Sequence, residues 1–162
     1  MDIKRKEITK RLSNCLERHI KANDTRVYWA KEVTFDYRTK DAGRVDYMRY
    51  KPKNNTVSGI EKGDFYCYEI KSCLDDFRSK HGHNFIGDFN YYILPQEVFR
   101  EVREEIPDYI GCYIPVGREL EVAKKAKRRD RNRATSEMLL MMFRSCARDR
   151  TNFKGDVSYE CI

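Results

Sequence analysis

The alternation of apolar and polar residues divides the first half of the chain into one helix and three strands. Residues 3–21 repeat apolar side chains at helical spacing and predict an amphipathic helix. Residues 26–36, 44–50 and 64–71 are rich in β-branched and aromatic types, which is typical of strands. The segment 52–63 contains Asn-Asn, Ser-Gly and Lys-Gly pairs, so we expect a polar turn there.

The second half of the chain alternates between predicted helices and strands. The pattern predicts helices at 74–80, at 95–105 and from Thr135, strands at 88–94, 109–114 and 119–123, and a loose tail from Thr151. The first three strands are joined by short turns and should pair as an antiparallel meander. Strands separated by helices would extend the same sheet in a mixed arrangement. We therefore expect an α/β fold, a mixed β-sheet flanked by helices.

The length of 162 residues and a hydrophobic content of 40% fit one domain with a real core. We expect residues 1–123 to form this core and residues 124–162 to add a basic segment and a helix packed on it. No stretch approaches the roughly 20 apolar residues of a membrane span, and the N-terminus lacks the apolar core of a signal peptide. The six dispersed cysteines form no Cys-x-x-Cys pair. These features favour reduced thiols and a cytoplasmic location.

Positive charge is concentrated in residues 124–133. This segment carries seven cations and one anion, which accounts for most of the net charge of +7. Such a run suits the phosphate backbone of a nucleic acid, because that contact is largely electrostatic. The alternative is a solvated linker that keeps the protein soluble. We expect contacts with nucleic acid from Lys124, Lys125, Lys127, Arg128, Arg129, Arg131 and Arg133.

The candidate chemistry lies at the end of the third predicted strand. Glu69 and Lys71 alternate with Ile70 and so point to the same side of that strand. A second acid, Asp46, lies on the preceding strand. An isolated Glu-x-Lys is most often an exposed surface pair, but here it follows an apolar strand and has an upstream acid. Asp46 and Glu69, with the Ile70 carbonyl, could hold Mg²⁺, which prefers hard oxygen ligands, and Mn²⁺ could substitute.

A carboxylate-held metal ion suits phosphodiester hydrolysis. The ion lowers the pKa of a bound water and neutralises charge on the phosphate. The compact ammonium of Lys71 could orient the water or stabilise the charge that develops on the phosphorus oxygens. We therefore expect a metal-dependent nuclease, with Asp46, Glu69 and Lys71 as catalytic residues.

The same residues resemble a known family. Arg44-Val45-Asp46 followed by Tyr68-Glu69-Ile70-Lys71-Ser72 is similar to the PD-(D/E)XK nuclease superfamily, which has the restriction-endonuclease-like fold. The run from Glu69 to Arg78 resembles the signature of its MmcB-like DNA-repair group. Continued to Tyr92, it looks like small proteins of Firmicutes and their phages. The resemblance covers roughly residues 27–115, and Val45 stands where the family often has proline.

The resemblance implies a magnesium-dependent DNA-cleaving core and a fourth acid. Glu32 takes that place in the MmcB-like pattern, while Glu7 and Glu17 on the first helix are the alternatives. A different class of function stays open, namely a non-catalytic module that binds nucleic acid or protein and retains the nuclease fold, such as a phage inhibitor of a host system. A homodimer is also left open, with the Met-rich run 138–142 as a contact or as a helix packed on the sheet.

Overall fold

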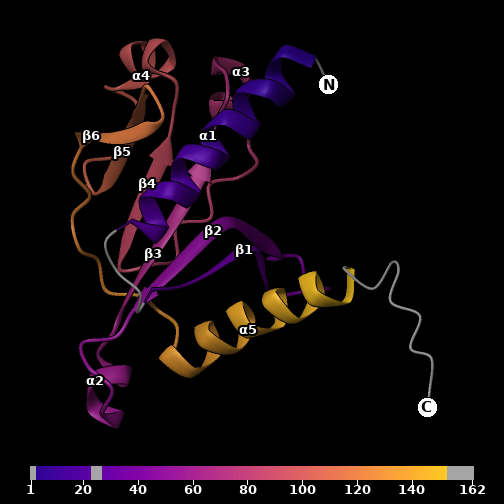
Figure 1. Ribbon diagram of the computed structural model, residues 1–162, viewed down its shortest axis with the longest axis vertical. Helices are drawn as coiled ribbons and strands as arrows, with labels where there is room; N and C mark the ends of the chain where they lie inside the picture. The colour runs from indigo at the N-terminus through magenta and orange to yellow at the C-terminus, as the bar shows by residue number, and fades with distance from the viewer. Residues whose placement is uncertain (1–2, 23–26, 153–162) are drawn as a thin grey trace, which may run out of the picture.

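Six strands form one mixed sheet in the computed structural model, which describes residues 3–22 and 27–152 (Figure 1). In sheet order, which is also chain order, they are β1 (Tyr28–Phe35), β2 (Gly43–Lys51), β3 (Asp64–Ile70), β4 (Phe89–Ile93), β5 (Ile110–Val116) and β6 (Glu119–Lys124). The first three are antiparallel, β4 and β5 run parallel to β3, and β6 returns antiparallel to β5. The predicted meander, the mixed sheet and the α/β fold class are confirmed.

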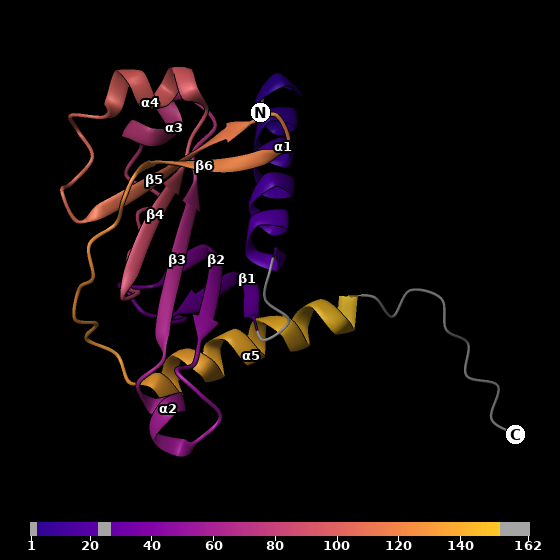
Figure 2. The ribbon, with the colours of Figure 1, turned by 60° about the vertical axis from the view of Figure 1, so that its left-hand side comes forward.

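Helices cover the sheet on both faces (Figure 2). Those that border the site are α1 (Ile3–Lys21), α3 (Leu74–Arg78), α4 (Gln96–Val102) and α5 (Thr135–Asn152). Tyr68 and Ile70 of β3 belong to the core beneath α1, whereas Phe65 and Cys67 belong to the core beneath α5. A third cluster joins α3 and α4 to β4 and β5 through Tyr92 and its neighbours. Because side chains alternate along a strand, Glu69 points to the same face as Cys67.

The structure differs from the predictions most clearly in a missed helix and in the start of the C-terminal tail. The segment 52–63 holds a short helix, α2 (Val57–Glu61), where only a turn was expected. Its N-cap is Thr56, whose hydroxyl accepts the Gly59 N–H at 3.0 Å. The helix escaped prediction because five residues are too few to show helical periodicity. The loose tail was predicted to begin at Thr151, but α5 continues through Asn152. The rest of that tail lies outside the described residues.

The C-terminal helix α5 packs on the face of the sheet to which Glu69 points. Met138 and Met142 are buried against β1, β2 and β3, as expected for a helix packed on a sheet. Leu140 and Phe143 on the same helix remain exposed, so the homodimer stays a prediction. No helix within residues 3–22 and 27–152 has the length and apolar character needed to cross a membrane.

Candidate active site

The register of β2 and β3 places Asp46 and Glu69 side by side. Tyr47 pairs with Tyr68 in this antiparallel ladder, so the next positions, 46 and 69, face each other on one side of the sheet. Asp46 Oδ2 also accepts the Ile70 N–H at 2.9 Å, which continues the ladder through a side chain. The two carboxylates therefore meet at the carboxyl end of β3, between α5 and the α3–α4 pair.

The loop that follows α3 holds Lys71 near the same carboxylates, and the charge of Lys71 opposes the rise in the pKa of both. Its Nζ donates to the His81 carbonyl at 2.5 Å, and the side chain is 3% exposed. Asn84 closes the other side of this loop, since its N–H donates to Glu69 Oε1 at 3.2 Å. The predicted trio is thus brought together, under a cover made by residues 79–84.

Electrostatic repulsion is built into this cluster. Glu69 is fully buried, and its Oε2 has no hydrogen-bond partner within the described chain. Burial, followed by the repulsion of Asp46, raises the pKa of Glu69 to about 8. Burial also raises the pKa of Asp46, although the Ile70 N–H and Lys71 counteract it. Two adjacent carboxylates with an orphaned oxygen are poorly stabilised by protein groups alone.

A polar cavity of about 470 Å³ opens onto this cluster. Asp46, Ile70 and Lys71 contribute to its wall, together with Gly43, Arg44, Asp76, Lys80, His81, Gly82 and Asn84. Asp76, which falls in the run that resembles the MmcB-like signature, is a further acid on this wall and could equally cap a local turn. It does cap locally, since Oδ2 accepts the Ser72 N–H at 3.1 Å, and Oδ1 pairs with Arg5 at 2.6 Å. Its charge also acts on Asp46, whose pKa it raises.

The three proposed fourth acids do not line this cavity. Glu32 lies across from Asp46 on β1, but its carboxylate pairs with Arg44 at 3.6 Å and with Arg148 at 3.8 Å. Glu17 accepts the Tyr47 hydroxyl at 2.9 Å, and Glu7 borders a separate hollow along α1. Asp76, rather than any of these, is the additional acid nearest to the predicted trio.

Intramolecular pairs anchor the basic segment 124–133, and those of Arg128 and Arg131 lie at the opposite end of β3 from Glu69. Arg131 reaches Asp88 at 2.5 Å, and Arg128 pairs with both Asp64 and Asp88 at 3.3 Å. The other pairs join Arg133 to Asp36 and Glu137, Lys127 to Asp108, and Lys124 to the carbonyls of Ile106 and Pro107. Asp64 begins β3, about 17 Å from Glu69 at roughly 3.3 Å per residue. These arginines thus anchor a strap across the sheet, and the nucleic-acid contact expected of residues 124–133 stays a prediction.

The residues present fit a hard divalent cation. Glu69 Oε2 is an unpartnered oxygen that faces the neighbouring Asp46 charge, and a cation would satisfy both. Within residues 3–22 and 27–152, no three His, Cys, Asp or Glu side chains form a ready cluster of ligands. Asp46, Glu69 and the Ile70 carbonyl would therefore leave several positions for water, as Mg²⁺ prefers.

Gly82 provides a test of this packing. It has a φ of +68°, and a Cβ there would lie 2.7 Å from Lys71 Nζ and 3.2 Å from Glu69 Oε2. Gly117 has a φ of +61° with nothing within 4 Å of such a Cβ. Its substitution by alanine therefore measures the cost of the left-handed backbone alone. We expect either alanine substitution to lower the free energy of unfolding by about 1–2 kcal/mol, because both force a left-handed residue. Only Gly82→Ala should also weaken Mn²⁺ binding, by roughly ten-fold or more, in calorimetric titration. Equal Mn²⁺ affinity in the two variants would contradict this arrangement.

No family model and no curated protein matches the chain. Among solved structures, it is similar to SPO1766, a protein of unknown function from Silicibacter pomeroyi. The two share 21% sequence identity and superpose with a TM-score of 0.64 over 94% of this chain and 97% of the other. At this identity the similarity shows a common fold and leaves the chemistry of the site to the residues themselves.

Proposed function

We propose that the protein is a metal-dependent nuclease that hydrolyses phosphodiester bonds in DNA, in the cytoplasm of a bacterium or a phage-infected cell. The observation that carries the proposal is the buried Glu69 carboxylate, which has one unpartnered oxygen and lies between Asp46 and Lys71. A module that only binds nucleic acid gains nothing from two adjacent carboxylates, since they repel phosphate.

Each residue of the trio has a role in this proposal. Asp46 and Glu69, with the Ile70 carbonyl, would hold a Mg²⁺ or Mn²⁺ ion. When bound, the ion lowers the pKa of a coordinated water and neutralises charge on the phosphate. Lys71 places an ammonium beside the same oxygens, and the His81 carbonyl fixes its direction. Its positive charge would stabilise the negative charge that develops on the phosphate oxygens.

One observation favours the second candidate, a non-catalytic binding module. The loop 79–84 contacts Glu69 and Lys71 through Asn84 and His81, and Glu69 is fully buried, so a phosphate reaches Glu69 only if this loop shifts. A loop that never opens would leave the fold as a binding scaffold. Cleavage measurements separate the two candidates.

The proposal is tested by incubating supercoiled, linear and branched DNA with Mg²⁺ or Mn²⁺. The wild type should cleave at least one of these substrates. Lys71→Ala should cut at least about 100-fold more slowly, because an electrostatic contact to the transition state is removed. Lys62→Ala, which removes an exposed lysine beyond α2, is the charge-matched control and should retain full activity. An absence of cleavage on every substrate with both metals, or equal rates for wild type and Lys71→Ala, would support the binding module.

A further inference from the structure

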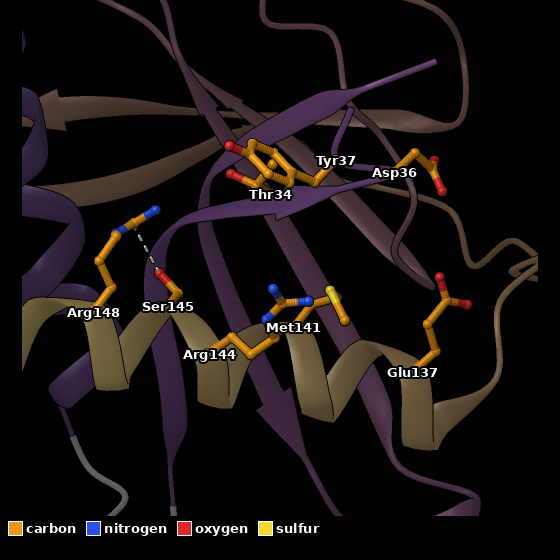
Figure 3. Close-up of a pocket in the computed structure, with 8 residues that line it drawn as sticks. All are labelled: Thr34, Asp36, Tyr37, Glu137, Met141, Arg144, Ser145 and Arg148. Atoms are coloured by element: carbon orange, nitrogen blue, oxygen red, sulfur yellow. Dashed lines mark hydrogen bonds between the residues drawn. The ribbon is translucent and has the colours of Figure 1, made fainter. Parts of the chain in front are cut away.

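A second cavity lies between α5 and the end of β1 (Figure 3). It measures about 600 Å³ and is lined by Thr34, Asp36, Tyr37, Glu137, Met141, Arg144, Ser145 and Arg148. Figure 3 shows Arg148 rising from α5 beside Ser145, whereas Arg144 extends along the helix toward Met141. The two arginines are four residues apart on one helix face, about 6 Å along its axis.

This cavity adjoins the candidate active site. Arg44 lines the active-site cavity, and Arg148 lines the second one. Both guanidinium groups pair with the same carboxylate, Glu32, at 3.6 and 3.8 Å. The second cavity also lies against the sheet face that carries Glu69, because Cys67 and Met138 share one core cluster there. Arg144, Arg148 and Arg44 therefore trace a cationic path that ends at the trio.

The carboxylates along this path are already neutralised. Arg133 pairs with Asp36 at 2.5 Å and with Glu137 at 2.6 Å. Within the described residues, no carboxylate pairs with Arg144, which is exposed. Arg148 also donates to Ser145 Oγ at 3.2 Å and to the Glu32 carbonyl, so it is fixed in place. The groove thus offers guanidinium donors and the hydroxyl groups of Thr34 and Tyr37.

Backbone strain marks the same region. Glu32, Asp36 and Arg38 have φ values of 49°, 51° and 63°, and all three lie in β1 or the turn beside the cavity. A non-glycine residue in this conformation costs of order 1 kcal/mol, and such residues cluster at functional sites. Asp36 lies in this strained turn and lines the groove beside α5.

We propose that this groove, with Arg144 and Arg148 as its phosphate contacts, binds the backbone of the nucleic acid whose scissile phosphate reaches Asp46, Glu69 and Lys71. The inference rests on the proposed nuclease function and deepens it. It assigns nucleic-acid binding to α5 and β1, whereas the basic segment 124–133 serves as an intramolecular strap. Guanidinium groups suit this role, because they form forked hydrogen bonds with phosphate oxygens.

The test measures binding of a short fluorescein-labelled DNA duplex by fluorescence anisotropy in EDTA, across a salt series. Arg144→Ala with Arg148→Ala should weaken binding by about ten-fold or more. The slope of log K against log salt should fall by about 2, near 0.9 for each lost phosphate contact. Because Arg148 also has structural contacts, Arg144→Glu is the second variant, and it should weaken binding while circular dichroism and the melting temperature stay unchanged. The double variant Lys125→Ala with Arg129→Ala alters the basic segment and serves as the control. It should change affinity less than two-fold, because the proposal assigns no phosphate contact to this segment.

Three outcomes would overturn the inference. The wild type does not bind the duplex, both groove variants keep the salt slope of the wild type, or the basic-segment variant loses affinity while the groove variants do not. Binding in EDTA does not require cleavage, so the two proposals fail separately. Binding through the groove without cleavage in Mg²⁺ or Mn²⁺ would remove the nuclease proposal alone. Cleavage by the wild type, together with unchanged duplex binding by the Arg144 and Arg148 variants, would contradict only the groove proposal.

Discussion

Glu69→Gln is expected to abolish metal-dependent cleavage and, at the same time, to stabilise the metal-free protein. The amide removes a metal ligand, so cleavage should fall by about 1,000-fold or more, since metal-ion catalysis contributes several kcal/mol. It also removes a buried charge that Asp46 repels and that lacks a partner at Oε2. We expect the free energy of unfolding in EDTA at pH 8.5 to rise by about 1–3 kcal/mol. Urea denaturation and the cleavage assay measure the two effects on one preparation.

The pH dependence of the stability gained by Glu69→Gln provides the control for this prediction. In the folded wild type the pKa of Glu69 is about 8, above its usual value of 4.5, so folding favours the protonated form. Glu69 therefore costs the wild type nothing below about pH 4.5, and it costs progressively more stability as the pH rises toward 8. The advantage of Glu69→Gln should be absent at acidic pH, grow through this window and level off above it. A variant that is less stable than the wild type at pH 8.5 would contradict the repulsion.

Asp88→Ala is expected to cause the largest loss of stability. Asp88 is 1% exposed and accepts the Phe65 N–H at 2.8 Å, Arg131 at 2.5 Å and Arg128 at 3.3 Å. Removing it leaves the largely buried Arg131 without a counter-charge and Phe65 without an acceptor. Breaking a buried pair in this way costs about 3–5 kcal/mol. The midpoint of urea denaturation should fall accordingly, and the strap 124–133 should become accessible to trypsin.

Asp130→Ala is the matched control for this prediction. Asp130 belongs to the same strap and lies 3.8 Å from Arg128, but its side chain is fully exposed. Exposed ion pairs of this kind contribute about 0–1 kcal/mol. Similar losses in the two variants, or a small loss in Asp88→Ala, would show that the strap is not anchored through Asp88.

The meander and the placement of Asp46 beside Glu69 could be predicted because they follow from local patterns. Alternation along 64–71 fixes which side chains share a face, and short connections force the first three strands to pair in order. Once Tyr47 faces Tyr68, the neighbouring pair of acids follows. The fold class was predictable for the same reason, since strands divided by helices extend a mixed sheet.

The loop that covers the site and the ion-pair partners of the basic segment could not be predicted. Both depend on contacts between residues distant in sequence. Gly82 approaches Lys71 only because the loop after α3 folds back with a left-handed residue, which no periodicity reports. The partners of Arg131 and Arg133 are Asp88 and Asp36, 43 and 97 residues away. Charge density along the sequence could not show that Arg131 and Arg133 hold distant segments together, and the nucleic-acid contact of this segment stays a prediction.

Anomalous scattering of Mn²⁺ in crystals of this protein decides whether Asp46 and Glu69 hold a metal ion. We expect one strong peak between the carboxylates of Asp46 and Glu69, within reach of the Ile70 carbonyl and beside the Lys71 ammonium. Crystals of Glu69→Gln prepared in the same way should lack it. Saturating Mn²⁺ with no density between these two carboxylates, or a peak that persists in Glu69→Gln, would contradict the account.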